Sequence, residues 1–211
     1  IMMSSLVFQS NQTVLFIGDS ITDCSRRQDQ EGLGHGYVRK ITELITARYP
    51  DRDISYINRG IGGDIVEGLE NRWTADVITP QPDWLSIKIG INNAARQGEP
   101  DEVYLPKWEA AYRRILTRSG DELNLSGIFI FEIFYIAGDV ESPQEWSIGT
   151  YNQVIHRLAE EFGAQLVPVG TVFQQAVVDR PGFLWTTMDG VHPNATGHTL
   201  MALEFLKLAG W

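Results

Sequence analysis

Four short motifs contain the residue types that transfer of an acyl group requires. They supply a serine hydroxyl, N–H donors that could hold an oxyanion, and an aspartate–histidine pair that could accept a proton. In chain order the motifs are Gly18-Asp19-Ser20, Gly62-Gly63-Asp64, Gly90-Ile91-Asn92 and Asp189-Gly190-Val191-His192. Together they indicate attack by a serine on a carbonyl carbon.

Ser20 is the candidate nucleophile. It follows an apolar run that ends at Ile17 and stands at the expected start of a helix, so its backbone N–H could meet negative charge. A serine hydroxyl attacks a carbonyl only after a base takes its proton. A serine between a strand and a helix also suits a helix N-cap. This motif taken alone favours a helix N-cap at Ser20. The other three motifs favour Ser20 as a nucleophile.

His192 is the candidate base, because imidazole gains and loses protons near neutral pH. Asp189 precedes it by three residues, a spacing at which side chains on one helical turn are neighbours, and its carboxylate could orient the ring. Asp-Gly is also common in turns, and His-Pro can precede a helix, so this motif alone leaves both interpretations open. His35, His156 and His198 have no such partner nearby in the sequence, and we interpret them as structural or solvated.

The candidate oxyanion donors are the backbone N–H groups of Ser20 and Gly63 and the side-chain amide of Asn92. Each such donor can stabilise a transition state by about 3 kcal/mol. Glycine and asparagine pairs also form turns, and Gly62 is an alternative to Gly63. The sequence contains no cluster of histidine, cysteine and carboxylate residues at metal-ligand spacing, so we expect neither a metal nor another cofactor.

Alternating strands and helices must position these residues. Apolar runs rich in β-branched residues predict strands at 13–17, 54–57, 84–89, 127–134 and 165–169, and helical spacing predicts helices at 37–49, 65–77, 106–118, 149–162, 171–178 and 194–209. This alternation predicts an α/β fold with a five-stranded parallel sheet between two layers of helices, in one domain over 1–211. Ser20, Gly63 and Asn92 follow the first three strands, at the edge where such sheets bind ligands.

Composition restricts the partners. A formal charge of −10 without a basic cluster argues against nucleic acid and anionic membranes, and it is compatible with a neutral substrate such as a sugar ester. No apolar run is long enough to cross a bilayer, and the single cysteine, Cys24, excludes an intrachain disulfide. Residues 1–5 lack the pattern of a signal peptide, so we expect a cytoplasmic protein.

Two charged residues stand inside expected apolar strands. Glu132 and Lys88 each need a partner if buried, and for Glu132 that partner could be Arg59 or Lys88. Asp19 could brace the loop that carries Ser20 or could be a turn or cap residue.

The motifs, with their flanking residues, resemble the four ordered blocks of the SGNH hydrolases, also called GDSL esterases and lipases: Phe16-Ile17-Gly18-Asp19-Ser20-Ile21-Thr22-Asp23, Asn58-Arg59-Gly60-Ile61-Gly62-Gly63-Asp64, Ile89-Gly90-Ile91-Asn92-Asn93 and Asp189-Gly190-Val191-His192-Pro193. The resemblance implies a flavodoxin-like three-layer fold. It also implies a triad of Ser20, His192 and Asp189, oxyanion donors at Ser20, Gly63 and Asn92, and no cofactor. Asn93 departs from the family, which usually has aspartate there, and this puts the orientation of Asn92 in question.

Within that family, several longer stretches are most similar to bacterial carbohydrate acetylesterases of the acetylxylan esterase type, among them Pro82-Asp83-Trp84-Leu85-Ser86-Ile87 and Met188-Asp189-Gly190-Val191-His192-Pro193. The resemblance implies hydrolysis of short acyl esters, acetyl above all, from a small or oligosaccharide substrate. It also implies a homo-oligomer, for which the apolar C-terminus ending at Trp211 could form a contact. Alternatives are a thioesterase or lysophospholipase of the same family, and a non-catalytic binding module on the same scaffold.

Overall fold

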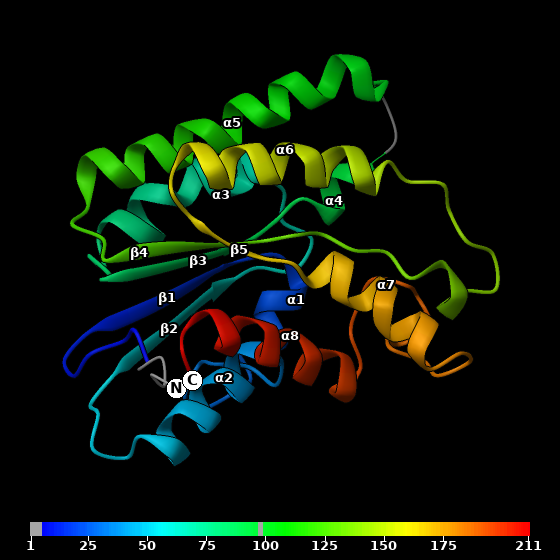
Figure 1. The fold of residues 1–211 in the computed structure, drawn as a ribbon. Coiled ribbons are helices and arrows are strands. Elements are labelled where there is room, and N and C mark those ends of the chain that lie inside the picture. Colours follow the sequence, from blue (N-terminus) through cyan, green and yellow to red (C-terminus); the bar gives the residue numbers. More distant parts are fainter. Residues whose placement is uncertain (1–5, 97–98) are drawn as a thin grey trace.

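The core of the fold is a parallel five-stranded sheet, as the sequence predicts (Figure 1). The structure, a computed structural model, describes residues 6–96 and 99–211, so the expectation about residues 1–5 lies outside it. Along the sheet the strand order is β2-β1-β3-β4-β5. The bounds are Thr13–Gly18 for β1, Ser55–Gly60 for β2, Trp84–Lys88 for β3, Gly127–Phe131 for β4 and Gln165–Val167 for β5.

Helices cover both faces of this sheet (Figure 1). One layer contains α3 (Val66–Trp73), α4 (Ile91–Ala94), α5 (Asp101–Glu122) and α6 (Ile148–Glu161), and the other contains α1 (Ser20–Asp23), α2 (Tyr37–Arg48), α7 (Val169–Asp179) and α8 (Ala195–Leu208). A π-helical turn, Thr74–Ile78, continues α3, and a 3-10 turn covers Ala137–Asp139. Because both faces are covered, β1 is buried from Val14 to Gly18, which explains its apolar sequence.

The register of the central strands brings their carboxyl ends to one edge. Gly18, the last residue of β1, lies opposite Gly60 in β2 and Lys88 in β3. A β-carbon at Gly18 would lie 2.2 Å from the carbonyl oxygen of Lys88, so only glycine allows the strands to approach this closely. The segments that follow β1, β2 and β3 therefore begin side by side.

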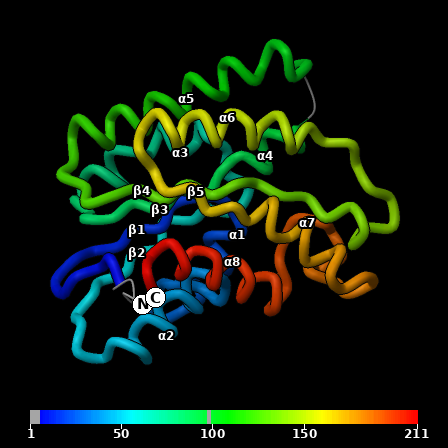
Figure 2. The backbone as a smooth tube through the Cα atoms, in the orientation of Figure 1, coloured from blue at the N-terminus to red at the C-terminus, as the bar shows by residue number. Residues whose placement is uncertain are grey.

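An aromatic cluster fixes the last helix against the sheet. The ring centroid of Phe205 in α8 lies 4.5 Å from the ring centroid of Phe129 and 5.5 Å from that of Phe16. All three side chains are buried. Figure 2 shows the chain returning through α8 to the side of α2. The backbone N–H of Val7 donates to the carbonyl of Ala209 at 2.8 Å, so the two described ends of the chain also meet. The segment that carries His192 leads directly into this anchored helix.

Some boundaries differ from the prediction. Helix α5 was expected over 106–118, but it begins at Asp101 and ends at Glu122. Pro106 lies within its second turn, where it forgoes one intrahelical bond, and Gly120 continues the helix on an open surface. The strand expected over 127–134 ends at Phe131, after which the chain leaves the sheet.

The apolar C-terminus packs within the chain. The indole N–H of Trp211 donates to the carbonyl of Leu44 in α2 at 3.1 Å, and the guanidinium of Arg48 lies 4.9 Å from the indole ring. Among the described helices, none is long and apolar enough to cross a membrane.

Candidate active site

Ser20 and His192 are in direct contact. The Oγ atom of Ser20 lies 2.8 Å from Nε2 of His192. Ser20 is the first residue of α1, directly after β1, and the carboxylate of Asp19 caps this short helix by accepting the N–H of Ile21 at 3.0 Å. The seryl hydroxyl therefore stands at the edge of the sheet with a nitrogen base within hydrogen-bond distance.

The carboxylate of Asp189 holds the other side of the imidazole. Its Oδ2 lies 2.6 Å from Nδ1 of His192, and its Oδ1 accepts the backbone N–H groups of His192 at 2.8 Å and Val191 at 2.9 Å. Burial alone would raise the pKa of Asp189, but these hydrogen bonds outweigh it and hold the pKa below its ordinary value. An ionised carboxylate places the ring proton on Nδ1, so the lone pair of Nε2 faces Ser20.

Buried groups outside the four motifs support this turn. Gly190 has φ of +73°, and a β-carbon there would lie 2.5 Å from the ring of Tyr135. The carboxylate of Asp139 accepts the N–H of Trp185 at 2.8 Å and both the N–H and the hydroxyl of Thr186, and that hydroxyl in turn accepts the N–H of Gly190 at 3.1 Å. Sequence reasoning missed Asp139 and Thr186, because a lone aspartate in a polar loop carries no signal of burial.

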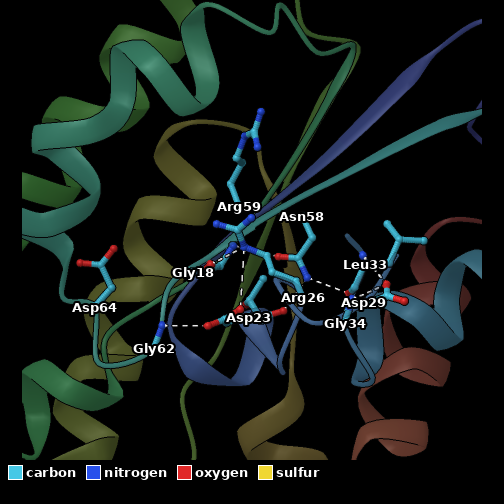
Figure 3. A network of polar contacts seen from close by, with 12 residues as sticks. Gly18, Asp23, Arg26, Asp29, Leu33, Gly34, Asn58, Arg59, Gly62 and Asp64 are labelled. Atoms are coloured by element: carbon cyan, nitrogen blue, oxygen red, sulfur yellow. Dashed lines mark hydrogen bonds and ion pairs between the residues drawn. The ribbon is translucent and has the colours of Figure 1, made fainter. Parts of the chain in front are cut away.

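The second motif follows β2 and contacts α1. The N–H of Gly62 donates to Oδ2 of Asp23 at 3.2 Å, as Figure 3 shows, and a β-carbon at Gly62 would lie 4.0 Å from Cβ of Ser20. Gly63 has φ of +78° and borders open space. The guanidinium of Arg26 donates to the carbonyl of Gly60 at 2.6 Å and holds the start of the loop. The N–H of Gly62 is thus engaged by Asp23, which favours Gly63 as the donor to a substrate.

Asn92 reaches the same loop from β3. Its Nδ2 donates to the carbonyl oxygen of Asp64 at 2.8 Å. An amide group carries two N–H donors, so this bond orients the group and leaves the second donor for a ligand. The turn before it is sterically demanding, because Gly90 has φ of +128° and a β-carbon there would lie 3.1 Å from Trp108.

Asn93, the departure from the family pattern, is fully buried and fully engaged. Its Nδ2 donates to Oε2 of Glu67 at 3.1 Å and to the hydroxyl oxygen of Tyr104 at 2.6 Å, and its Oδ1 accepts the N–H of Val66 at 3.2 Å. An aspartate here would face the carboxylate of Glu67. The amide therefore connects α4 to α3 and α5 without a charge conflict.

Lys88, in β3, and Glu132, directly after β4, do not pair with each other. Lys88 forms a fully buried ion pair with Asp19, with 3.0 Å between Nζ and Oδ2. Burial lowers the pKa of Lys88 and the carboxylate of Asp19 opposes that effect. Glu132 pairs with neither Arg59 nor Lys88, because its carboxylate lies 2.6 Å from Nε2 of His156. Segments distant in sequence supply both partners, so spacing could not reveal them.

A cavity of about 450 Å³ lies beside Tyr135. Its wall includes Tyr135, Trp146, Phe173 and Gln174, and the rings of Tyr135 and Trp146 are 4.5 Å apart. Because Tyr135 also packs against Gly190, the cavity shares one wall with the turn that carries Asp189 and His192.

Known proteins resemble this chain in sequence and in fold. Residues 16–200 match the model of the GDSL-like lipase/acylhydrolase family. An acetylxylan esterase from Geobacillus stearothermophilus is 36% identical over 214 residues, which cover 96% of this chain and 95% of that protein. The crystal structure of Axe2, an acetylxylan esterase from the same organism, aligns with a TM-score of 0.85 at 34% identity over 97% of both chains. Other solved forms of that esterase are described as catalytic mutants and have a serine, an aspartate or a histidine replaced by alanine.

A more distant neighbour has the same fold. An α/β hydrolase enzyme from the metagenome of Lake Arreo, Spain, aligns with a TM-score of 0.83 at 26% identity over 98% of both chains. The expected three-layer fold is thus confirmed. The chain belongs to the GDSL-like lipase/acylhydrolase family and is a carboxylic ester hydrolase.

Proposed function

We propose that the protein hydrolyses short-chain esters, with acetyl esters of a carbohydrate as its substrates, through a triad of Ser20, His192 and Asp189. The observation that carries the proposal is the unbroken chain of contacts from the seryl Oγ to Nε2, at 2.8 Å, and from Nδ1 to the carboxylate, at 2.6 Å. This order of nucleophile, base and orienting acid performs acyl transfer on several unrelated folds.

The reaction proceeds in two halves. Ser20 Oγ bonds to the carbonyl carbon of the ester while its proton passes to Nε2 of His192, and a tetrahedral oxyanion forms. The bond to the alcohol then breaks, the alcohol takes the proton from Nε2, and an acyl-enzyme remains. A water molecule repeats the attack, gives its proton to Nε2, and the carboxylic acid leaves as Oγ recovers a proton. Asp189 stays ionised throughout and stabilises the imidazolium.

The oxyanion is held by the backbone N–H groups of Ser20 and Gly63 and by the amide of Asn92. Gly63 borders open space, and one N–H of the Asn92 amide is oriented by its bond to Asp64. Such donors act mainly in the transition state, where the negative charge develops.

Two observations support an acetylated carbohydrate as the substrate. The acetylxylan esterase matches this chain over nearly its full length, and the net charge of −10 suits a neutral substrate better than an anionic one. The proposal therefore names acetylated xylo-oligosaccharides as the first substrates to measure.

The first experiment tests the chemistry. Ser20→Ala should lose nearly all hydrolysis of an aryl acetate and all labelling by a serine-reactive phosphonate, whereas Ser142→Ala, an exposed loop variant, should keep both. A Ser20→Ala protein with normal turnover would show that another residue is the nucleophile. Absence of labelling and of turnover in the unaltered protein would favour a binding module.

The second experiment tests the substrate class. We expect faster hydrolysis of an aryl acetate than of an aryl octanoate, and release of acetate from acetylated xylo-oligosaccharides. Faster turnover of the long-chain ester, or of an acyl thioester, would favour the lysophospholipase or thioesterase alternative.

We also retain the predictions of a homo-oligomer and of a cytoplasmic location. Because Trp211 packs on α2 of its own chain, the contact between subunits would need further surface. Sedimentation velocity over a range of protein concentrations would test self-association, and cell fractionation would test location.

A further inference from the structure

The guanidinium group of Arg72, in α3, is largely buried and contacts residues of the first two motifs and of β2. Its side chain is 15% exposed. Nε and Nη2 both lie 2.8 Å from Oδ2 of Asp64, and Nη1 lies 2.6 Å from Oδ2 of Asp76. Nη1 also donates to the carbonyl of Arg59 at 2.7 Å, and Nη2 donates to the carbonyl of Gly18 at 3.3 Å. Four of the five N–H donors of this arginine therefore have a hydrogen-bond acceptor, and Nη2 lies within ion-pair distance of Asp64.

The acceptors belong to the segments that carry the site. Gly18 lies two residues before Ser20, Arg59 lies near the end of β2, and Asp64 directly follows Gly63. The guanidinium group of Arg72 therefore joins the end of β1 to both ends of the loop that contains Gly63, the proposed oxyanion glycine.

The contact with Asp64 extends to the other proposed donor. The carbonyl oxygen of Asp64 accepts Nδ2 of Asn92 at 2.8 Å, and the N–H of Gly63 is one residue away along the same backbone. A shift of Asp64 would move the Gly63 N–H and rotate the Asn92 amide together. Two of the three proposed oxyanion donors thus depend on where Asp64 lies.

We propose that Arg72 is a positioning residue for the oxyanion hole, and that it acts through Asp64 on Gly63 and Asn92. The inference rests on the proposed function, because it requires these groups to hold the oxyanion. Two carboxylates balance the charge of Arg72, so its contribution is the geometry of the hole rather than a long-range field.

Lysine is the informative substitution. It keeps the positive charge but offers one compact ammonium group, which cannot reach acceptors spread around a planar fork. Misplaced oxyanion donors weaken binding of the transition state more than binding of the ester. We expect Arg72→Lys to lower kcat by about 10- to 100-fold and to change KM by less than about twofold. A role in stability alone would lower the melting temperature without this division between kcat and KM.

Arg114→Lys is the matched control. Arg114 in α5 also binds α3, through the carboxylate of Glu70, but it is exposed and distant from the motifs in sequence. The Arg114→Lys variant should leave kcat unchanged. Any fall in its kcat would measure the general effect of weakening the contact between α5 and α3. If Arg72→Lys fails to fold, Asp64→Asn takes its place, since it keeps the backbone carbonyl that binds Asn92 and removes the charge that binds Arg72. A fall in kcat at constant KM is again expected.

A double-mutant cycle that combines Arg72→Lys with Asn92→Ala tests whether Arg72 acts through Asn92. If Arg72 acts partly through Asn92, the combined loss in kcat should be well below the product of the two separate losses. Unchanged kcat in Arg72→Lys, or in Asp64→Asn where that variant replaces it, or full multiplication of the losses, would overturn the inference. An Asn92→Ala protein with normal kcat would instead contradict the oxyanion assignment on which it rests.

Discussion

The hydroxyl oxygen of Ser20 lies 2.8 Å from Nε2 of His192, although 172 positions separate the two residues in the chain. Ser20 is held by β1 and the cap of α1, and His192 by the turn that leads into α8. Because α8 packs through Phe205 against Phe129 and Phe16, the hydrophobic core sets the distance between the hydroxyl of Ser20 and the imidazole of His192. Preorganisation of this kind makes catalysis sensitive to small changes at the turn.

The first prediction concerns Asp189. Asp189→Asn should lower kcat by about 10³- to 10⁴-fold with little change in KM, because a neutral amide no longer orients the imidazole or stabilises its charged form. Steady-state kinetics on an aryl acetate measures the effect. Asp51→Asn, at an exposed position, is the control and should behave as the unaltered protein. Retention of kcat within about tenfold in Asp189→Asn would contradict the triad.

The second prediction concerns the family departure at Asn93. Asn93→Asp would bury a carboxylate against that of Glu67, whose Oε2 lies 3.1 Å from the present amide nitrogen. Burial and the hydrogen bond to Glu67 raise the pKa of Tyr104 to about 12, so Tyr104 keeps its single hydroxyl proton, which Glu67 already accepts. We expect a loss of about 1–3 kcal/mol in the free energy of unfolding near neutral pH.

Glu67→Gln added to Asn93→Asp should restore most of that stability, because it removes one of the two facing carboxylates. Urea unfolding of both single variants and the double variant measures the coupling. Equal stability of Asn93→Asp and the unaltered protein, or no recovery in the double variant, would show that Glu67 is not the reason asparagine is accommodated here.

The third prediction concerns the buried pair of Lys88 and Asp19, both fully inaccessible and 3.0 Å apart. Lys88→Met leaves a buried carboxylate without its cation and should lower the free energy of unfolding by about 3–5 kcal/mol near neutral pH. The double variant with Asp19→Asn should lose clearly less, because the remaining amide is neutral. If the double variant is at least as unstable as Lys88→Met, the ion pair does not account for the loss.

The fourth prediction is a pH dependence of stability. Burial, with the positive charges of Lys40 and Lys88, lowers the pKa of His198 from 6.5 to about 4. Below about pH 6.5 His198 binds a proton in the unfolded chain but not in the folded protein. The free energy of unfolding therefore falls as pH falls towards about 4. Between about pH 7 and pH 4.5 this group should remove about 2–3 kcal/mol from the free energy of unfolding.

Urea unfolding of His198→Gln should show a pH dependence smaller by that amount, while His35→Gln, at an exposed position, should match the unaltered protein. A His198→Gln protein with the full loss of stability at acid pH would assign the effect to other groups.

Local pattern was sufficient for the sheet and for the motifs. The inner strands β1 and β4 could be recognised because strands covered on both faces are largely apolar, and the motifs could be placed because parallel strands end at a common edge. Local pattern failed at the ends of the helix expected over 106–118, because the helix in the structure includes Pro106 and continues through Gly120. Packing overrides the weak helix propensities of these two residues. Burial of one face of α5 stabilises the helix by more than the one missing hydrogen bond destabilises it.

What the amino-acid sequence determined by itself is therefore the alternation of elements, the residues of the motifs and the class of chemistry they could perform. What only the tertiary structure decided is which groups meet: Ser20 with His192, Lys88 with Asp19, and Arg72 with Asp64. The physical reason is that residue type and periodicity are local properties of a chain. A contact between distant segments depends instead on how the helices pack on the sheet, and that is settled only when the whole core is buried.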